Sequence, residues 1–236
     1  MYNILVVDDE KEITDAVEVY LKNQNYNVFK AYNGQEALSI FEKEDIHLIL
    51  MDIMMPILDG INATIKIREK SAVPIIFLSA KSEDMDKILG LNIGADDYVT
   101  KPFNPLELLA RVNSNIRRYT NYSKVSANDQ TSNEQANEDS IIKIGGIELN
   151  DVTKEILVDG NPIKVTPIEF KILHLFMKNQ GRVFSIEDIY EKVWNEPAYN
   201  PDTVTVHIRR IRQKIEINPK EPKYLKVVWG IGYKFG

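Results

Sequence analysis

The sequence predicts two domains of different class: an α/β domain built on a parallel sheet, then a smaller α+β domain. Three observations support this. Short apolar runs alternate with helical periodicity in the first half, a polar segment without periodicity follows, and the last third has the pattern of strands, helices and strands. A chain of 236 residues is long enough for two ordinary domains. We place the first domain at residues 1–118, a flexible linker at 119–140 and the second domain at 141–236.

Five short apolar runs in the first domain have the composition of strands that are buried on both faces. They are residues 4–7, 28–31, 48–51, 75–78 and 98–99. Apolar residues between these runs recur at helical spacing, and a last helical stretch follows Pro105. Strands that alternate with helices predict a doubly wound, five-stranded parallel sheet of the flavodoxin-like kind, with helices on both faces.

Composition narrows the class of protein. The linker is rich in Asn, Ser, Gln, Thr and acids, which is typical of a flexible segment. The net charge is −6, but residues 141–236 hold 15 Lys and Arg against 12 Asp and Glu, so the second domain is basic and is compatible with DNA binding. The absence of cysteine excludes disulfides and thiolate chemistry. No apolar run is long enough to cross a bilayer and no basic leader precedes Asp8, so we expect a cytoplasmic protein that does not bind membranes.

The second domain begins with two alternating segments, residues 142–144 and 156–158, which are bounded by turn residues and are typical of hairpin strands. The sequence Thr166-Pro167-x-Glu169 predicts the start of a helix, with a capping box between Thr166 and Glu169. Two more helical segments follow, and residues 224–228 and 232–235 predict a closing hairpin. Strands, three helices and a terminal hairpin describe a winged helix-turn-helix.

Polar side chains follow the predicted strands of the first domain at the points where these strands end. They are Asp8 and Asp9, Asp52, Ser79 and Lys101. The carboxyl ends of parallel strands meet at one edge of the sheet, which is the expected ligand site. Three carboxylates there need a compensating cation, and hard oxygen ligands suit Mg²⁺. A carboxylate at such a site can accept a phosphoryl group, with Lys101 and the Ser79 hydroxyl contacting the phosphoryl oxygens.

Each of these residues alone has an ordinary explanation, since a strand-end Asp usually caps a turn or helix and a lone Lys is usually solvated. The combination Asp8-Asp9-Glu10, Asp52 in DIMMPILDG, Ser79-Ala80 and Lys101-Pro102-Phe103 resembles the receiver domain of bacterial two-component response regulators across residues 1–118. The resemblance implies that Asp52 accepts phosphate from a sensor histidine kinase and becomes 4-aspartylphosphate. It also implies a cis Lys101–Pro102 peptide bond.

The same resemblance implies roles for the neighbouring residues. Asp9, Asp52 and the backbone carbonyl of Met54 would hold Mg²⁺, with Asp8 contributing through water, and Lys101 would contact the phosphate. Ser79 and Tyr98 would be the switch pair. Similarity to the OmpR/PhoB subfamily implies a homodimer on phosphorylation. Its interface would pair Lys87 with Glu107 and Asp97 with Arg111 around apolar contacts, and it comprises Lys87, Ile88, Leu91, Asp97, Glu107, Leu109 and Arg111.

The segment TVTVHIRRIRQKIE at residues 203–216 predicts an amphipathic helix. Val204, Ile208, Ile211 and Ile215 form the core-facing stripe. At 100° per residue, Val206, Arg209, Arg210 and Gln213 fall on the opposite face. An Arg-rich outer face suits the major groove of DNA, although this segment alone slightly favours a solvated basic helix.

Residues 141–236 resemble the OmpR/PhoB winged-helix effector domain, because T-P-x-E-F precedes this helix and W-G-x-G-Y-K-F follows it. The resemblance implies binding to tandem half-sites in double-stranded DNA. Val206 and Arg210 would contact bases. Thr203, which flanks the outer face of this helix, is a further predicted DNA contact. The predicted phosphate contacts are His207, Arg209, Arg212 and Tyr233. The loop at 195–201 would contact RNA polymerase as well as DNA. Two residues depart from the family pattern: Asp202 stands where some members have a basic phosphate contact, and Trp229 stands where Arg is frequent. The chain is most similar to the VanR-type branch, which implies genes for the cell envelope or glycopeptide resistance.

Taken together, these features predict a transcription regulator, not an enzyme, in which phosphorylation at Asp52 promotes dimerisation and sequence-specific DNA binding. Two alternatives stay open. One is a Mg²⁺-dependent phosphatase with an aspartyl-phosphate intermediate; such enzymes place nucleophile and acid as D-x-D after one strand, whereas Asp52 follows a different strand from Asp8 and Asp9. The other is a constitutive DNA-binding protein with an inactive receiver, which the complete set of acceptor-site residues disfavours.

Overall fold

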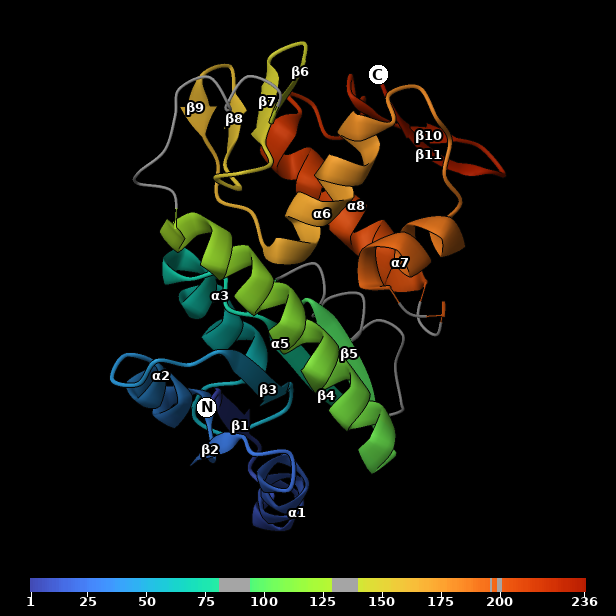
Figure 1. Cartoon of the computed structure of the whole chain (residues 1–236). Helices are drawn as coiled ribbons and strands as arrows, with labels where there is room; N and C mark the ends of the chain where they lie inside the picture. The colour runs from blue at the N-terminus through green and yellow to red at the C-terminus, as the bar shows by residue number, and fades with distance from the viewer. Residues whose placement is uncertain (81–93, 129–139, 196, 199–200) are drawn as a thin grey trace. The chain divides into compact units, whose positions relative to one another are not determined.

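The chain forms two compact units, Met1–Tyr119 and Thr120–Gly236 (Figure 1). The computed structural model describes residues 1–80, 94–128, 140–195, 197–198 and 201–236. Within these residues, no helix has the length and apolar character needed to span a membrane.

The first unit is a five-stranded parallel sheet with flanking helices, as the sequence predicts. Its strands run side by side in the order β2-β1-β3-β4-β5. The elements are β1 (Asn3–Val7), α1 (Lys11–Lys22), β2 (Asn27–Ala31), α2 (Gly34–Phe41), β3 (Leu48–Asp52), α3 (Gly60–Lys70), β4 (Ile75–Ala80), β5 (Asp97–Lys101) and α5 (Pro105–Asn128).

The period of two along the strands produces a core on each side of the sheet. In β1, Ile4 and Val6 pack with one cluster, whereas Leu5 and Val7 are equally buried but lie outside it. That cluster includes residues from α1 and α5, namely Val17 and Leu21 with Leu108, Val112 and Ile116. The helices α1 and α5 therefore cover one face of the sheet.

Helix α5 extends further than the sequence predicted. It continues to Asn128, ten residues past the expected boundary at residue 118. These residues include Asn and Ser, which are weak helix formers, so their helical state depends on propagation from the packed part of α5 rather than on intrinsic propensity. The rest of the predicted linker, apart from Ser140, lies outside the described residues.

The second unit has an antiparallel sheet of order β6-β7-β8-β9, three helices and a separate hairpin. Its elements are β6 (Ile141–Ile144), β7 (Ile147–Asn150), β8 (Ile156–Val158), β9 (Asn161–Pro162), α6 (Pro167–Lys178), α7 (Ile186–Trp194), α8 (Asp202–Ile215), β10 (Leu225–Val228) and β11 (Gly232–Phe235). The capping box of α6 is present: the Thr166 hydroxyl accepts from the Glu169 amide, and the Glu169 carboxylate accepts from the Thr166 amide at 2.8 Å.

The hairpin partner of β6 is a strand that the sequence analysis did not predict. It is β7, with Ile144 opposite Ile147, so Gly145 and Gly146 form the whole two-residue loop. A tight turn of this kind needs positive φ, and Gly145 has φ 61°. From the sequence, Gly145 and Gly146 were recognised only as turn residues. The strand after them was missed, although Ile147 and Leu149 have the alternation of a half-buried strand and both are fully buried.

The loop after β3 is held close to the end of that strand by a glycine. Asp59 caps α3 by accepting from the Asn62 amide at 2.7 Å, and the Gly60 amide donates to the Ile53 carbonyl at 3.0 Å. A Cβ at Gly60 would lie 1.9 Å from the backbone oxygen of Asp52. Backbone cannot give way as a flexible side chain can, so residue 60 must be glycine for Asp52 to keep its place.

We expect Gly60→Ala to destabilise the first unit by about 2–4 kcal/mol, because the added methyl group meets the backbone of β3. Both tryptophans of the chain, Trp194 and Trp229, lie in the second unit. During urea unfolding, far-UV circular dichroism reports the transitions of both units, whereas tryptophan fluorescence reports only that of the second. The transition that appears in circular dichroism but not in fluorescence therefore belongs to the first unit. Lys66→Ala, on an exposed face of α3, is the control. An unchanged midpoint for Gly60→Ala would contradict the steric account.

Candidate functional site

The strand ends of the first unit bring the predicted acidic residues together. Asp8 directly follows β1, Asp9 comes next, and Asp52 is the last residue of the neighbouring strand β3. One carboxylate oxygen from each residue lies within 4.8 Å of the others. Asp8 and Asp52 are buried whereas Asp9 is exposed. The three groups are hard oxygen donors with an opening to solvent, which fits a divalent cation such as Mg²⁺.

Lys101 provides the compensating charge within the chain. Its Nζ lies 2.6 Å from Asp8 Oδ2 and 3.1 Å from Asp52 Oδ2. Burial of the ammonium opposes its charged form, but the contacts with Asp8 and Asp52 outweigh burial and raise the pKa of Lys101 above its ordinary value. The following Lys101–Pro102 peptide bond is cis, as predicted.

Asp52 is almost fully enclosed at the end of β3. Its Oδ1 accepts from the Ile53 amide at 2.7 Å, and its Oδ2 faces Lys101. Burial raises the pKa of Asp52; Lys101 counteracts this rise and the charge of Asp8 adds to it. The buried Ser79 hydroxyl, near the end of the adjacent strand β4, has no hydrogen-bond partner among the residues that the structure describes. A buried hydroxyl without a partner is unfavourable, and a phosphoryl oxygen on Asp52 is a group that it can bind.

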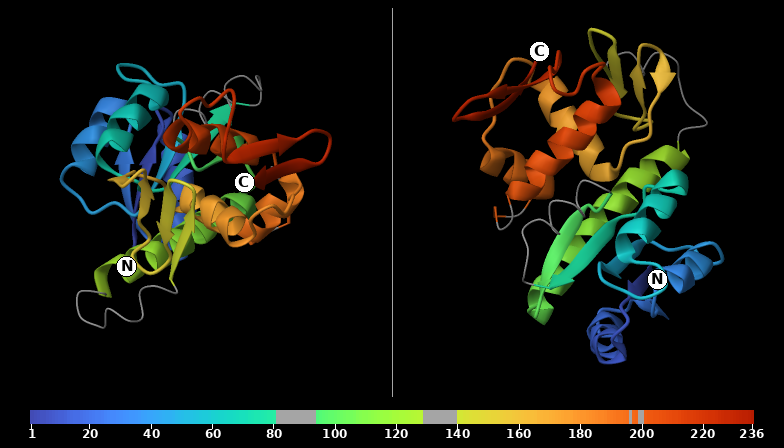
Figure 2. Two further views of the ribbon diagram at one scale, coloured as in Figure 1. Left: turned by 90° about the horizontal axis from the view of Figure 1, so that it is seen from above. Right: turned by 180° about the vertical axis from the view of Figure 1, so that it is seen from behind.

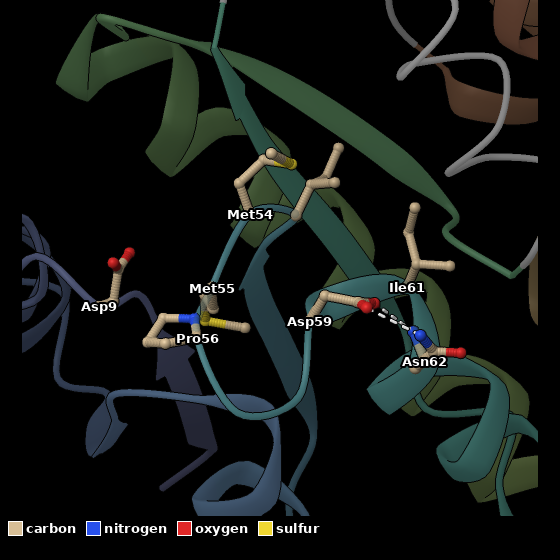
Figure 3. A pocket seen from close by; sticks show the side chains of 8 residues that line it. Asp9, Met54, Met55, Pro56, Asp59, Ile61 and Asn62 are labelled. Carbon is tan, nitrogen blue, oxygen red and sulfur yellow. Dashed lines mark hydrogen bonds between the residues drawn. The ribbon is translucent and has the colours of Figure 1, made fainter.

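A pocket of about 600 Å³ adjoins the acidic residues and shares Asp9 with them (Figure 3). Figure 3 shows Asp9 facing the loop that follows β3, with Met54, Met55 and Pro56 along that loop. The start of α3 contributes Asp59, Ile61 and Asn62, and Ile53 completes the lining. Met54, the predicted carbonyl ligand, has a side chain that is 73% exposed at this opening.

The residues predicted for a dimer interface divide into two groups. Lys87, Ile88 and Leu91 lie outside the described residues. Asp97 and Glu107 both contact Arg111 within the same chain: Arg111 Nη1 lies 2.8 Å from Asp97 Oδ2, and Nη2 lies 3.0 Å from Glu107 Oε1. Leu109 packs half-buried against the core, and Tyr98, of the predicted switch pair, is half-buried in β5.

The apolar stripe of α8 lies where the sequence predicts it. Val204, Ile208, Ile211 and Ile215 all belong to the core of the second unit. Over residues 203–215 of α8, the exposed side chains are those of Thr205, Arg209 and Gln213, which recur every fourth residue. Thr203 and Val206, which we expected beside or on the outer face, are buried, although neither belongs to that core.

Arg210 is held inside the second unit by a buried acid. Its Nη2 lies 3.0 Å from Glu169 Oε1, and Lys214 Nζ lies 2.6 Å from Glu169 Oε2. Glu169 is fully buried. Burial favours its neutral form, but the charges of Arg210 and Lys214 and the hydrogen bonds from Lys214 and Thr166 outweigh burial and lower the pKa of Glu169 to about 2. The predicted base contact Arg210 is thus an ion-pair partner of α6 in this structure.

Two other predicted phosphate contacts also have partners inside this unit. His207 is buried, with its ring 5.5 Å from that of Trp194, which stacks on Tyr190. Arg212 Nε donates to the Leu225 carbonyl at 2.8 Å, and its guanidinium lies 5.7 Å from the centre of the Tyr233 ring. These contacts attach α8, the predicted recognition helix of the second unit, to α7 and to the β10–β11 hairpin.

Sequence reasoning missed two acids that organise this unit. Glu169 was recognised as a helix cap but not as the partner of α8, which lies 41 residues further along the chain. Glu216 accepts three backbone amides, those of Lys223, Tyr224 and Leu225, at 2.8–2.9 Å and so fixes the start of β10. The one sequence signal for the buried role of Glu169 was its place as an acid on an otherwise apolar helix face. No sequence signal indicated the amide contacts of Glu216.

The comparisons with known proteins agree with this arrangement. Residues 4–113 match the response regulator receiver domain, and residues 160–235 match the family of C-terminal domains of transcriptional regulatory proteins. The chain is 45% identical to regulatory protein VanR of Enterococcus faecium, over 98% of this chain and 97% of that protein. It is 44% identical to regulatory protein VanRc of Enterococcus gallinarum, over 98% and 96%. Among solved structures, response regulator DrrB, a Thermotoga maritima OmpR/PhoB homologue, is 32% identical with a TM-score of 0.50 and 100% and 99% coverage.

A receiver fold with its acidic strand ends, followed by a winged-helix domain, defines a two-domain transcription regulator. The chain belongs to the OmpR/PhoB family of two-component response regulators. Membership implies a histidine kinase as its partner and DNA as its target. The alternatives of a phosphatase and of a constitutive DNA-binding protein are not favoured.

The low pKa of Glu169 predicts a pH dependence of stability. The pKa falls from 4.5 to about 2 on folding, so Glu169 stabilises the folded second unit above pH 4.5, and this contribution is lost as the pH falls through about 2. We expect Glu169→Gln to destabilise this unit by about 3 kcal/mol at neutral pH, and the difference from the unmodified chain to shrink progressively at acidic pH.

Tryptophan fluorescence during urea unfolding measures this difference. The control is Glu187→Gln, on an exposed carboxylate of α7, which should behave like the unmodified chain. A Glu169→Gln deficit that stays constant down to about pH 2 would show that packing, not charge, accounts for the effect.

Proposed function

We propose that Asp52 is the phosphoacceptor of this response regulator, and the clustering of Asp8, Asp9, Asp52 and Lys101 at one sheet edge carries the proposal. A carboxylate oxygen of Asp52 forms a bond to the phosphorus of a phosphohistidine on the kinase. The P–N bond breaks and its electron pair returns to the imidazole. The product is 4-aspartylphosphate, and its hydrolysis by the chain itself is slow at most.

The residues around Asp52 fit a bound Mg²⁺. Asp9, Asp52 and the Met54 carbonyl would hold the ion, with Asp8 contributing through water. When bound, the ion supplies positive charge against the phosphoryl oxygens. Lys101 binds a phosphoryl oxygen with the ammonium that now faces Asp8 and Asp52.

Ser79 and Tyr98 form the proposed switch pair. The Ser79 hydroxyl has no hydrogen-bond partner within the described part of the chain, and the phosphoryl group would provide one. Tyr98 lies in β5, one strand over and opposite Phe77 of β4. Movement of Ser79 toward the phosphate would change the packing next to Tyr98. The switch therefore acts by shifting a two-state equilibrium rather than by creating a new fold.

We further propose the organisation of the active form. The receiver spans residues 1–118, the linker 119–140 and the effector 141–236. Phosphorylated receivers form a homodimer through Lys87, Ile88, Leu91, Asp97, Glu107, Leu109 and Arg111. The ion pairs of Arg111 with Asp97 and Glu107 inside one chain would then have to exchange for pairs between chains.

The dimer places two effector domains on tandem half-sites of DNA in the cytoplasm, where the chain regulates transcription together with RNA polymerase. The proposed DNA contacts are Thr203, Val206, His207, Arg209, Arg210, Arg212 and Tyr233. Arg209 is the one whose side chain is already exposed on α8. The similarity to VanR supports genes for the cell envelope or glycopeptide resistance as the targets.

We expect Asp52→Asn to abolish phosphorylation by a small-molecule phosphodonor such as phosphoramidate, because the amide cannot accept a phosphoryl group. With the donor, the unmodified chain should shift from monomer to dimer in size-exclusion chromatography and bind DNA more than about tenfold more tightly. Asp59→Asn is the matched control, since Asn keeps the cap of α3 and lies in the same loop. If the donor acts equally on Asp52→Asn, the assignment is wrong.

We expect Lys101→Met to bind Mg²⁺ about three- to tenfold more tightly, because removal of the ammonium leaves the carboxylates with an uncompensated charge. Phosphorylation should nevertheless slow by more than about tenfold, since the phosphoryl oxygens lose a cationic partner. Calorimetric Mg²⁺ titration and a phosphoramidate time course measure the two effects. Lys11→Met, which removes an exposed ammonium at the start of α1, should change neither. Weaker Mg²⁺ binding by Lys101→Met would contradict a shared site.

A further inference from the structure

Methionine sulfur atoms are concentrated around Asp52. The chain has six methionines and no cysteine, and three of the six, Met51, Met54 and Met55, lie within three residues of Asp52. In a chain without cysteine, the methionine thioether is the only side chain sulfur that a mild oxidant can modify. Half of these oxidisable groups are therefore next to the proposed phosphoacceptor.

The three methionines differ in their exposure to solvent. Met51 in β3 is fully buried, Met55 is half-buried and Met54 is 73% exposed. Figure 3 shows the Met54 and Met55 side chains leaving the loop in different directions, with Met55 beside Pro56. An oxidant must contact the sulfur atom, so exposure decides which thioether reacts. Met54 is the one of the three that solvent reaches freely.

The pocket beside the acidic residues gives an oxidant access to Met54. Its volume of about 600 Å³ is far larger than a peroxide molecule, and Met54 lines it together with Asp9 and Asp59. In the left view of Figure 2, the strands of the first unit lie between α5 on one side and α2 and α3 on the other, and the start of α3 forms part of the pocket wall. The described residues that line the pocket include two carboxylates and no basic side chain. This lining favours a neutral oxidant over an anionic one.

We propose that Met54 is a redox-modification site, at which oxidation by a neutral hydroperoxide slows the phosphorylation of Asp52. The sulfur lone pair of Met54 attacks the outer oxygen of the peroxide and forms the S–O bond of methionine sulfoxide. The O–O bond breaks, and its electron pair leaves on the other oxygen. The proton of the attacked oxygen moves to this departing oxygen, which leaves as water or an alcohol. Sulfur is thereby oxidised by two electrons and the peroxide is reduced by two.

Oxidation changes the chemistry at the entrance to the acceptor site. The thioether is apolar, whereas the sulfoxide oxygen carries partial negative charge and accepts hydrogen bonds. Met54 lies two residues after Asp52 and shares the pocket with Asp9, so the new dipole stands next to a carboxylate of the acidic site. A phosphoryl donor is anionic, and additional negative charge at the entrance opposes its approach. The inference rests on Asp52 as the proposed phosphoacceptor.

Peptide mass spectrometry of the full chain, after timed exposure to hydrogen peroxide, tests the selectivity of the reaction. Met51 and Met177 are 0% and 3% exposed, whereas Met1 is 85% exposed, so the chain contains its own references. We expect Met54 to gain one oxygen at a rate similar to that of Met1 and at least about tenfold faster than Met51 and Met177. Oxidation of Met54 no faster than that of Met177 would overturn the proposal.

A phosphoramidate time course with Mg²⁺ tests the effect on Asp52, and each chain is compared with itself before and after peroxide. We expect peroxide to slow phosphorylation of the unmodified chain by about threefold or more. Met54→Leu should keep its own untreated rate, although its other methionines still oxidise. Met55→Leu, which removes the half-buried neighbour, should respond as the unmodified chain does. Methionine sulfoxide reductase with a thiol reductant should restore the rate of the unmodified chain.

Three other outcomes would contradict the proposal. If Met54 is oxidised but the rate of phosphorylation stays the same, the thioether only consumes oxidant. If peroxide slows Met54→Leu as much as the unmodified chain, a different methionine is responsible. If far-UV circular dichroism shows that peroxide unfolds the chain, the slower rate has a structural cause. Phosphorylation of Asp52→Asn by phosphoramidate would instead overturn the phosphoacceptor assignment, so failure of the proposed function is distinguishable from failure of this inference.

Discussion

The contact of the Lys101 ammonium with Asp8 and Asp52 is the constraint on which the receiver site depends. Three carboxylates within 4.8 Å of one another repel, and two of them are buried, where that repulsion is least screened. In the strand order β1-β3-β4-β5, Lys101 lies on the strand that is farthest from Asp8. Its long side chain must therefore extend past the end of β4 to reach the Asp8 carboxylate. It therefore passes the strand end that carries Ser79, so the proposed phosphoryl site has residues from four strands around it.

Much of this geometry could be predicted, because it depends on residue type and strand position alone. Apolar runs define the strands, parallel strands end at one edge, and the polar residues at those ends must meet there. The identity of each contact could not be predicted in the same way. Arg111 was expected to pair with Asp97 across a dimer, yet within one chain it is only fourteen residues from that acid and reaches it directly. A local pair and an intermolecular pair have the same sequence pattern.

The recognition helix shows the same limit more sharply. Periodicity assigns the core stripe of α8 because apolar side chains have only one favourable direction to face. An arginine is long enough to face outward at Cβ and return inward at its guanidinium. Arg210 and Arg212 return, one to Glu169 and the other to the Leu225 carbonyl, whereas Arg209 stays exposed. Which arginine turns inward depends on hydrogen-bond and ion-pair acceptors that are distant in the sequence. A helical wheel of α8 alone does not include these acceptors.

The two units use buried acids in opposite ways. This difference suits a receiver that changes conformation and an effector that binds DNA. In the effector, Glu169 has two cations and a helix cap for partners, so its charge is compensated and α6 is joined to α8. In the receiver, one lysine faces two buried carboxylates, and the Ser79 hydroxyl has no hydrogen-bond partner among the described residues. That site is incomplete without added ligands, so a change of charge at Asp52 can redistribute its conformations.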